Sequence, residues 1–234
     1  MIMSNKNDLR TQRNGTIINT TSKAQEKRLG NSLVYLHQQL STKHGVQIIH
    51  ESEWRLRDVV GKLRHNFPEV TFNYYFNTTS MRPDGGILSL VDKHNTSYPI
   101  LITEVKNQGT NDLRESEGKS KQARGNAIER LGKNVIGFRA SLLNESIFPF
   151  VCFGDGCDFA HDSSIVDRVV TIAMFGDINK TSLHNEGNSG QFNRGSFYFR
   201  VKLWTEEDMF PIMLDIADRS ILYYFSKYGI SLFK

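Results

Sequence analysis

Apolar residues recur at helical spacing in the first part of the chain. Four leucines form the pattern: Leu29, Leu33, Leu36 and Leu40. Intervals of three and four residues place them on one face of a helix, so a helix is expected over about 24–42. A second helix is expected within 52–67, because Pro68 disfavours a helical conformation in the residue before it. Residues 1–23 are polar and are expected to form a flexible arm.

Shorter apolar stretches predict strands. Residues 70–77 are rich in aromatic side chains and alternate in part, which is typical of a strand. Two further apolar runs, 86–92 and 98–106, are separated by the turn-forming residues "KHNTS". The runs 148–154 and 196–204 complete the set of expected strands.

Helical spacing returns in the second half of the chain. The apolar stripe there consists of Ile128, Leu131, Val135, Phe138 and Leu142. Two more helices are expected, one within 163–176 and a long one over 205–228. Mixed strands and helices in this order predict an α/β fold, in which a central mixed β-sheet is flanked by helices within a single domain, 24–234.

Composition narrows the class of protein. Hydrophobic residues make up 38% and charged residues 23% of the 234 residues, which is typical of a soluble globular protein. No apolar run reaches the roughly 18 residues of a membrane span, so no membrane partner is expected. Two cysteines are too few for a disulfide framework, and a reducing cytoplasm is the expected location. The net charge of +4 permits a polyanionic partner.

Charged residues accompany the two apolar runs 86–92 and 98–106. An aspartate in "MRPDGG" directly precedes the first run, and a glutamate and a lysine lie within the second. If 86–92 and 98–106 pair as antiparallel neighbours, Asp84 at the start of the first strand lies beside the end of the second. That end contains Glu104 and Lys106, which are two residues apart and therefore point to the same side of the sheet. Two carboxylates and one ammonium group are thus expected at one place.

This combination suits phosphodiester hydrolysis. Asp84 and Glu104 offer the hard oxygen ligands that Mg²⁺ prefers, and the metal would polarise the phosphate and lower the pKa of an attacking water. Lys106 would orient that water and stabilise negative charge in the transition state. Each half of the pattern also has an ordinary interpretation, since Pro-Asp-Gly is a common turn and Glu-x-Lys is common on a solvated strand. The apolar character of the second strand disfavours a solvated face.

The residues Pro83-Asp84, Glu104 and Lys106 resemble the Pro-Asp…(Asp/Glu)-x-Lys pattern of a large nuclease superfamily. The segments "RGNAIERLGKN" (124–134) and "NESIFPFVCFGDGCDF" (144–159) are similar to the EcoRI group of type II restriction endonucleases, which includes MunI-like enzymes. The resemblance is strongest over 82–160 and implies a restriction-endonuclease-like core. It also implies Mg²⁺-dependent cleavage of double-stranded DNA at an AATT-centred palindrome.

The segment 124–134 has two interpretations. Asn126 and Glu129 have the spacing of a helix capping box, which would leave Arg124 and Arg130 as surface charges. A helix N-terminus also attracts phosphate, and asparagine can pair with adenine in the major groove. The resemblance assigns base reading or subunit contact to Arg124, Gly125, Asn126, Ala127, Glu129 and Arg130. Lys133 and Asn134, one turn further along, are expected to contact phosphates, which position the protein without specifying a base.

Arg124 bears on the recognition site. In EcoRI-like members a small residue precedes Gly-Asn-Ala, whereas MunI-like members have arginine there, which favours CAATTG over GAATTC or a relaxed outer pair. The resemblance further implies a homodimer, a four-base 5′ overhang with 5′-phosphate ends, and a cognate DNA methyltransferase as functional partner. Two alternatives stay open: a repair or structure-specific nuclease of the same superfamily, and a DNA-binding regulator without catalytic activity.

Overall fold

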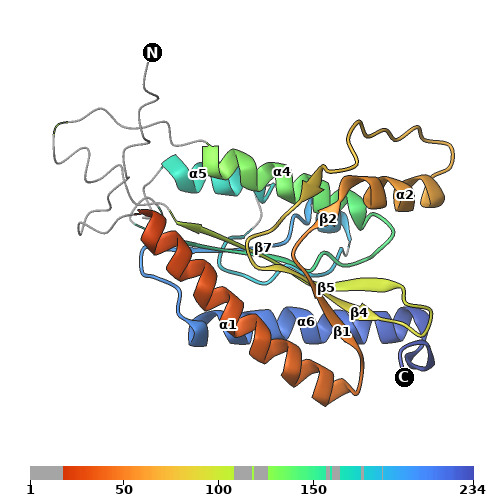
Figure 1. Cartoon of the computed structure of the whole chain (residues 1–234). Helices are drawn as coiled ribbons and strands as arrows, with labels where there is room; N and C mark the ends of the chain where they lie inside the picture. Colours follow the sequence, from red (N-terminus) through yellow and green to blue (C-terminus); the bar gives the residue numbers. More distant parts are fainter. Residues whose placement is uncertain are drawn as a thin grey trace, which may run out of the picture.

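The computed structural model has three layers, with a five-stranded sheet between two layers of helices (Figure 1). It describes residues 18–107, 118, 126–156, 159, 164–174, 177–185 and 187–234. Strand order across the sheet is β1-β4-β5-β6-β7. These strands are β1 (Ile48–Glu51), β4 (Gly86–Val91), β5 (Ser97–Asn107), β6 (Phe150–Asp155) and β7 (Ser196–Arg200).

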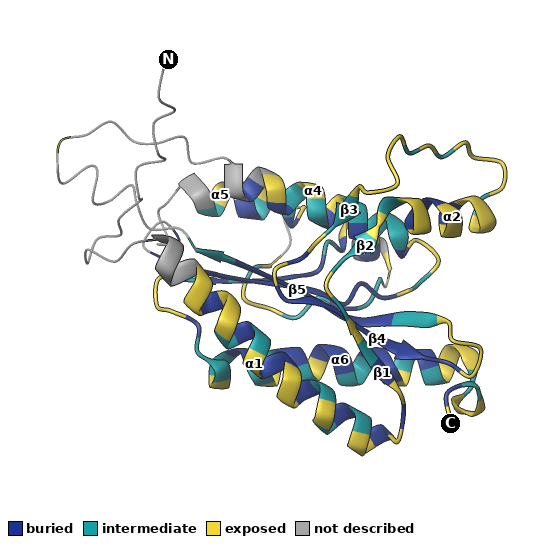
Figure 2. Ribbon diagram, in the orientation of Figure 1, coloured by how far each residue is buried: buried dark blue, intermediate teal, exposed yellow. Residues whose placement is uncertain are grey.

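The sheet is mixed, as expected from the sequence. The β1–β4 and β4–β5 pairs are antiparallel, whereas the β5–β6 and β6–β7 pairs are parallel. β4 and all but the ends of β5 are buried, because helices cover both faces of the sheet (Figure 2). The prediction of an α/β fold with a central mixed sheet flanked by helices is confirmed.

One face of the sheet is covered by α1 (Ile18–His44) and α6 (Glu206–Tyr228), which also pack against each other. Leu29, Leu33, Leu36 and Leu40, the stripe found in the sequence, are all buried in this core. Thr205 caps α6 by accepting a hydrogen bond from the backbone NH of Asp208. Pro211 is the sixth residue of that helix, past the four N-terminal positions whose NH groups lack an intrahelical partner, so α6 loses one backbone hydrogen bond there.

The opposite face is covered by α4 (Asn126–Ser141) and α5 (Ser164–Ile172) (Figure 1). The second stripe found in the sequence, from Ile128 to Leu142, is buried in this core. α2 (Leu56–Asn66) contacts α4 from the side. Two short 3₁₀ helices are also present, Asn188–Phe192 and Ile230–Leu232.

The expected strand over 70–77 is wrong. This segment is an irregular loop between α2 and β3 (Ser80–Met81), and Tyr75 and Phe76 are 90% and 70% exposed. Its aromatic residues gave a strand-like pattern, but the segment pairs with no strand of the described sheets. The carbonyl oxygen of Phe72 instead accepts two hydrogen bonds from the side chain of Arg64 of α2.

Two features of the first third were not anticipated. β1 pairs with β4 at the edge of the sheet, and β2 (Trp54–Arg55) pairs with β3 in a separate two-stranded ribbon. α1 begins at Ile18 rather than near residue 24, and residues 1–17 of the expected arm lie outside the described residues. Among the described residues, no helix is long and apolar enough to cross a membrane.

Candidate active site

The turn before β4 lies beside the end of β5, as the antiparallel pairing predicted. Gly86 pairs with Thr103 in the β4–β5 register, and the backbone NH of Gly85 donates to the carbonyl oxygen of Thr103 at 3.0 Å. Asp84 therefore lies against residues 104–106. The hairpin brings together two segments that are twenty residues apart in the sequence.

The two glycines after Asp84 are needed for this close approach. A Cβ atom on Gly85 would lie 2.1 Å from Oγ1 of Thr103. Gly86 has a φ of +79°, and a Cβ there would lie 2.6 Å from the carbonyl oxygen of Glu51. "PDGG" is thus both a turn, as its ordinary interpretation held, and the element that presents Asp84.

Asp84, Glu104 and Lys106 form one hydrogen-bonded cluster. The ammonium Nζ of Lys106 lies 2.8 Å from Oδ2 of Asp84 and 2.5 Å from Oε1 of Glu104. It also donates to the carbonyl oxygen of Val105 at 3.0 Å. The backbone NH of Asp84 donates to Oε2 of Glu104 at 3.2 Å. The three side chains predicted from the sequence therefore meet at one place.

The part that the backbone carbonyl of Val105 takes in the cluster was not predicted, because sequence patterns identify side chains and not backbone groups. Asp84 Oδ2, Glu104 Oε1 and Val105 O surround a single cationic centre, the Lys106 ammonium. Three hard oxygens are a donor set that Mg²⁺ accepts, so these residues fit a divalent ion. The fit does not use histidine or cysteine, and no group of three or more His, Cys, Asp or Glu residues suited to a metal occurs in the described part.

Burial controls the electrostatics of the cluster. The Glu104 side chain is only 3% exposed, and this burial raises its pKa, with the nearby Asp84 carboxylate adding to the effect. Burial alone would lower the pKa of Lys106, but attraction to Glu104 and Asp84 outweighs it and raises that pKa. The Asp84 side chain is 30% exposed. The cluster is therefore open to solvent on the Asp84 side and closed behind Glu104.

Asn134 of α4 reaches the same cluster. Its Nδ2 donates to Oε1 of Glu104 at 3.2 Å. The sequence suggested a phosphate contact for Asn134. The structure shows that its side chain bonds to Glu104, a contact that the sequence did not predict. The pairing depends on how α4 lies over β5, which no local pattern specifies.

The other predicted DNA-reading residues lie on or before α4. The helix begins at Asn126, close to the start that the capping interpretation requires. Arg130 and Lys133 are exposed. Arg124 and Gly125 lie outside the described residues, as do the side chains of Asn126, Ala127 and Glu129.

A buried carboxylate beneath the cluster was missed by the sequence reasoning. Asp155, at the end of β6, is 0% exposed. Its Oδ2 accepts from Nε2 of Gln25 at 3.0 Å and from the backbone NH of Trp204 at 3.1 Å, and its Oδ1 accepts from Nδ2 of Asn107 at 2.5 Å. Burial raises the pKa of Asp155, while the bonds from Trp204 and Asn107 oppose that rise. Since Asn107 directly follows Lys106, this network holds the end of β5 that carries the cluster.

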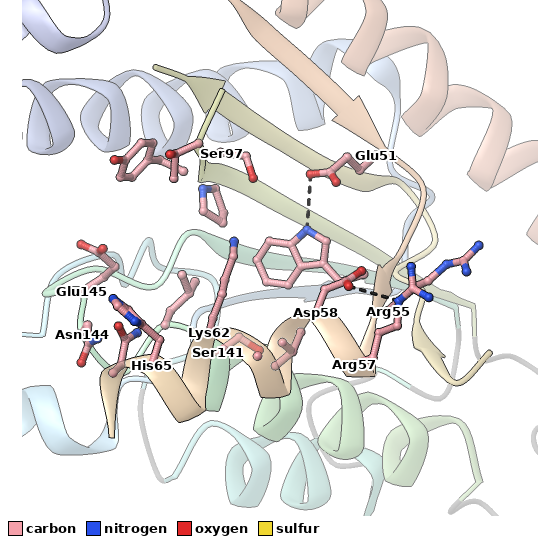
Figure 3. A pocket seen from close by; sticks show the side chains of 18 of the residues that line it. Glu51, Arg55, Arg57, Asp58, Lys62, His65, Ser97, Ser141, Asn144 and Glu145 are labelled. Carbon is pink, nitrogen blue, oxygen red and sulfur yellow. Dashed lines mark hydrogen bonds and ion pairs between the residues drawn. The ribbon is translucent and has the colours of Figure 1, made fainter. Parts of the chain in front are cut away.

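A separate cavity of about 800 Å³ lies at the other end of β5 (Figure 3). It is lined by Ser97 of that strand, by Lys62 and His65 of α2, and by Glu51 and Glu145. Acidic and basic side chains are mixed around it, and none of the predicted catalytic residues lines it. The cluster at the far end of the strand is therefore the candidate active site.

Comparison with known proteins agrees with this geometry. The family model for "Restriction endonuclease EcoRI" matches residues 11–231, so the chain belongs to this family of type II site-specific deoxyribonucleases. It is 33% identical over 194 residues to the type II restriction enzyme RsrI of Cereibacter sphaeroides, covering 68% of this chain and 70% of that protein. It is 28% identical over 210 residues to the type II restriction enzyme EcoRI of Escherichia coli, covering 72% and 76%.

Proposed function

We propose that the chain is a Mg²⁺-dependent, homodimeric restriction endonuclease that cleaves double-stranded DNA at an AATT-centred palindrome, with CAATTG favoured over GAATTC or a relaxed outer pair. The observation that carries the catalytic part is the convergence of Asp84, Glu104 and Lys106 at the end of the β4–β5 hairpin. Restriction endonucleases generally use a divalent metal ion, and both relatives named above are type II restriction enzymes. Cleavage outside AATT would leave 5′-phosphate ends with a four-base 5′ overhang.

Asp84 and Glu104 would hold the metal, which polarises the scissile phosphate and acidifies an attacking water when bound. Lys106 would orient the water and neutralise charge that develops on the phosphate. Glu104 is fixed by three donors, so it is oriented before DNA arrives. Asp84 is the more exposed carboxylate and faces the side from which the phosphate would enter.

The segment at the start of α4 would read the bases. Arg124, Gly125, Asn126, Ala127, Glu129 and Arg130 form the proposed reading set, and Lys133 and Asn134 are the proposed phosphate contacts. Support comes from α4 itself: it begins at Asn126, where free backbone NH groups favour an anion, and Arg130 and Lys133 are exposed on it. A palindromic site matches a two-fold dimer with one active site per strand.

The cellular setting follows from this activity. A cutter without protection would attack the genome of its own host, so a cognate DNA methyltransferase of the same specificity is its expected partner. Host DNA would be reached in the cytoplasm, which also suits a chain whose one described cysteine, Cys152, is free and buried. We propose that residues 24–234 form the single nuclease domain.

Incubation with plasmid DNA and Mg²⁺ tests this function against its two alternatives. Discrete fragments whose sequenced ends begin with AATT are expected. A smear or nicking at irregular DNA structures would instead indicate a repair or structure-specific nuclease. Binding without any cleavage would indicate a regulator that lacks catalytic activity.

Arg124→Ala tests the outer base pair. A bidentate arginine–guanine contact is worth about 1–3 kcal/mol of discrimination. The ratio of the cleavage rate on CAATTG to the rate on duplexes with another outer pair should therefore be roughly 10-fold smaller in the variant than in the parent protein. Cleavage of a set of duplexes that differ only at the outer pair measures this. Unchanged outer-pair preference would remove Arg124 from the reading set.

A further inference from the structure

Helix α4 has two features that matter for the proposed function. Its first residues form the proposed reading segment, and Asn134, eight residues further along, bonds to Glu104. At 1.5 Å per residue these two places are about 12 Å apart along one rigid element. A movement of α4 on the DNA would therefore be transmitted to the carboxylate.

The hydrogen bonds of Glu104 come from three separate segments. Lys106 of β5 and Asn134 of α4 both donate to Oε1, while the backbone NH of Asp84 donates to Oε2. An ionised carboxylate only accepts hydrogen bonds, so the amide NH₂ of Asn134 must face it. Within the described part of α4, Asn134 is the residue that bonds directly to the cluster.

We propose that Asn134 is a positioning residue that couples the placement of α4 to the orientation of Glu104, so that correct reading of the bases favours cleavage. This proposal rests on the proposed function. The side chain is short and half-buried, and one of its two amide hydrogens is directed to Glu104. Small displacements of α4 would lengthen a 3.2 Å bond beyond a useful distance. This role replaces the phosphate contact proposed above for Asn134, whose amide is directed to Glu104. Lys133, which is exposed, is better placed to meet a phosphate.

The test compares Asn134→Ala and Asn134→Leu with the parent protein on a cognate duplex and on duplexes with one altered base pair. Leucine has the same branched arrangement of side-chain heavy atoms as asparagine but no donor, and alanine removes the side chain, so the pair separates a packing defect from a lost hydrogen bond. A hydrogen bond to a charged group is typically worth about 1.5–3 kcal/mol, which corresponds to a roughly 10- to 100-fold lower single-turnover cleavage rate. The Kd for the duplex without Mg²⁺ should change by less than about twofold.

A second readout separates coupling from support of the site alone. The ratio of single-turnover rates on cognate and altered duplexes should fall in both variants, because α4 no longer reports its position to Glu104. Asn31→Ala is the matched control, since Asn31 on α1 also donates its Nδ2 to a glutamate, Glu206, but lies on the opposite face of the sheet. Its rates and ratio should equal those of the parent.

The outcomes are distinct. Parental rates and ratios in both Asn134 variants would overturn the proposal, and so would a loss found entirely in Kd, which is what a pure phosphate contact predicts. A lowered rate with an unchanged cognate-to-altered ratio would also overturn the coupling. If the parent protein itself did not cleave DNA, the proposed function would fail instead.

Discussion

Replacement of Lys106 by alanine should lower the single-turnover rate of DNA cleavage roughly 10³-fold, which is about 4 kcal/mol of transition-state stabilisation. The reason is that Nζ of Lys106 is the cationic group held between both carboxylates, within 2.8 Å of each. Binding of the recognition sequence should persist, because the proposed reading residues lie on and before α4 rather than on β5. Single-turnover kinetics with Mg²⁺ and a binding titration without it measure the two effects separately.

The same variant should be less stable without Mg²⁺. Removal of the ammonium group leaves Asp84 and the buried Glu104 as two facing carboxylates, whose repulsion has no compensating charge. Addition of Mg²⁺ should raise its Tm more than it raises that of the parent, since a ligand that binds only the folded state stabilises it. Lys180→Ala is the control, because this exposed lysine forms an ion pair with the exposed Asp177. A Lys106→Ala protein that cuts at the parental rate would contradict the role of the lysine.

The meeting of Asp84, Glu104 and Lys106 could be predicted because the information that specifies it is local. Two strands joined by a short turn usually pair with each other, so the position of Asp84 against Glu104 follows from the hairpin alone. Side-chain alternation then places Glu104 and Lys106 on one side. Both apolar helical stripes were found for a similar reason, since each follows one helix and is buried along its length, with Leu142 directly after the end of α4.

Features that depend on distant pairing were not predictable. β1 is only four residues long, and its apolar part is too short to distinguish a strand from a loop until β4 is known to lie beside it. The loop 70–77 failed in the opposite direction, because its local pattern suits a strand but no neighbouring strand pairs with it in the described sheets. Strand formation requires a partner, which local sequence does not specify.

The contacts of Asn134 and Asp155 show the same limit at the site. Asn134 meets Glu104 only because α4 crosses over β5, and Asp155 meets Gln25 across 130 residues of chain. An isolated Asn on a helix or Asp at a strand end looks like an ordinary surface residue. Burial of Asp155 is what marks it as structural, because a buried carboxylate is tolerated only when donors surround it.

Replacement of Asp155 by leucine should therefore lower the free energy of unfolding by about 3–5 kcal/mol. Three donors would lose their acceptor in the interior: the Gln25 and Asn107 amides and the backbone NH of Trp204. Asp155→Asn should cost less, about 1–2 kcal/mol, because its oxygen can still accept two of these bonds. Urea unfolding with an unchanged m-value measures both effects.

Asp215→Ala is the matched control for that series. Asp215 forms an exposed pair with Arg219 one helical turn away, at 3.1 Å, and its loss should change stability by less than about 0.5 kcal/mol. If Asp155→Leu were as stable as Asp215→Ala, the buried network would contribute nothing to the fold. We expect the free energy of unfolding to be lowest for Asp155→Leu, intermediate for Asp155→Asn and highest for the parent protein. This order is expected because the destabilisation follows the number of buried donors that lose their acceptor, rather than the loss of the charge itself.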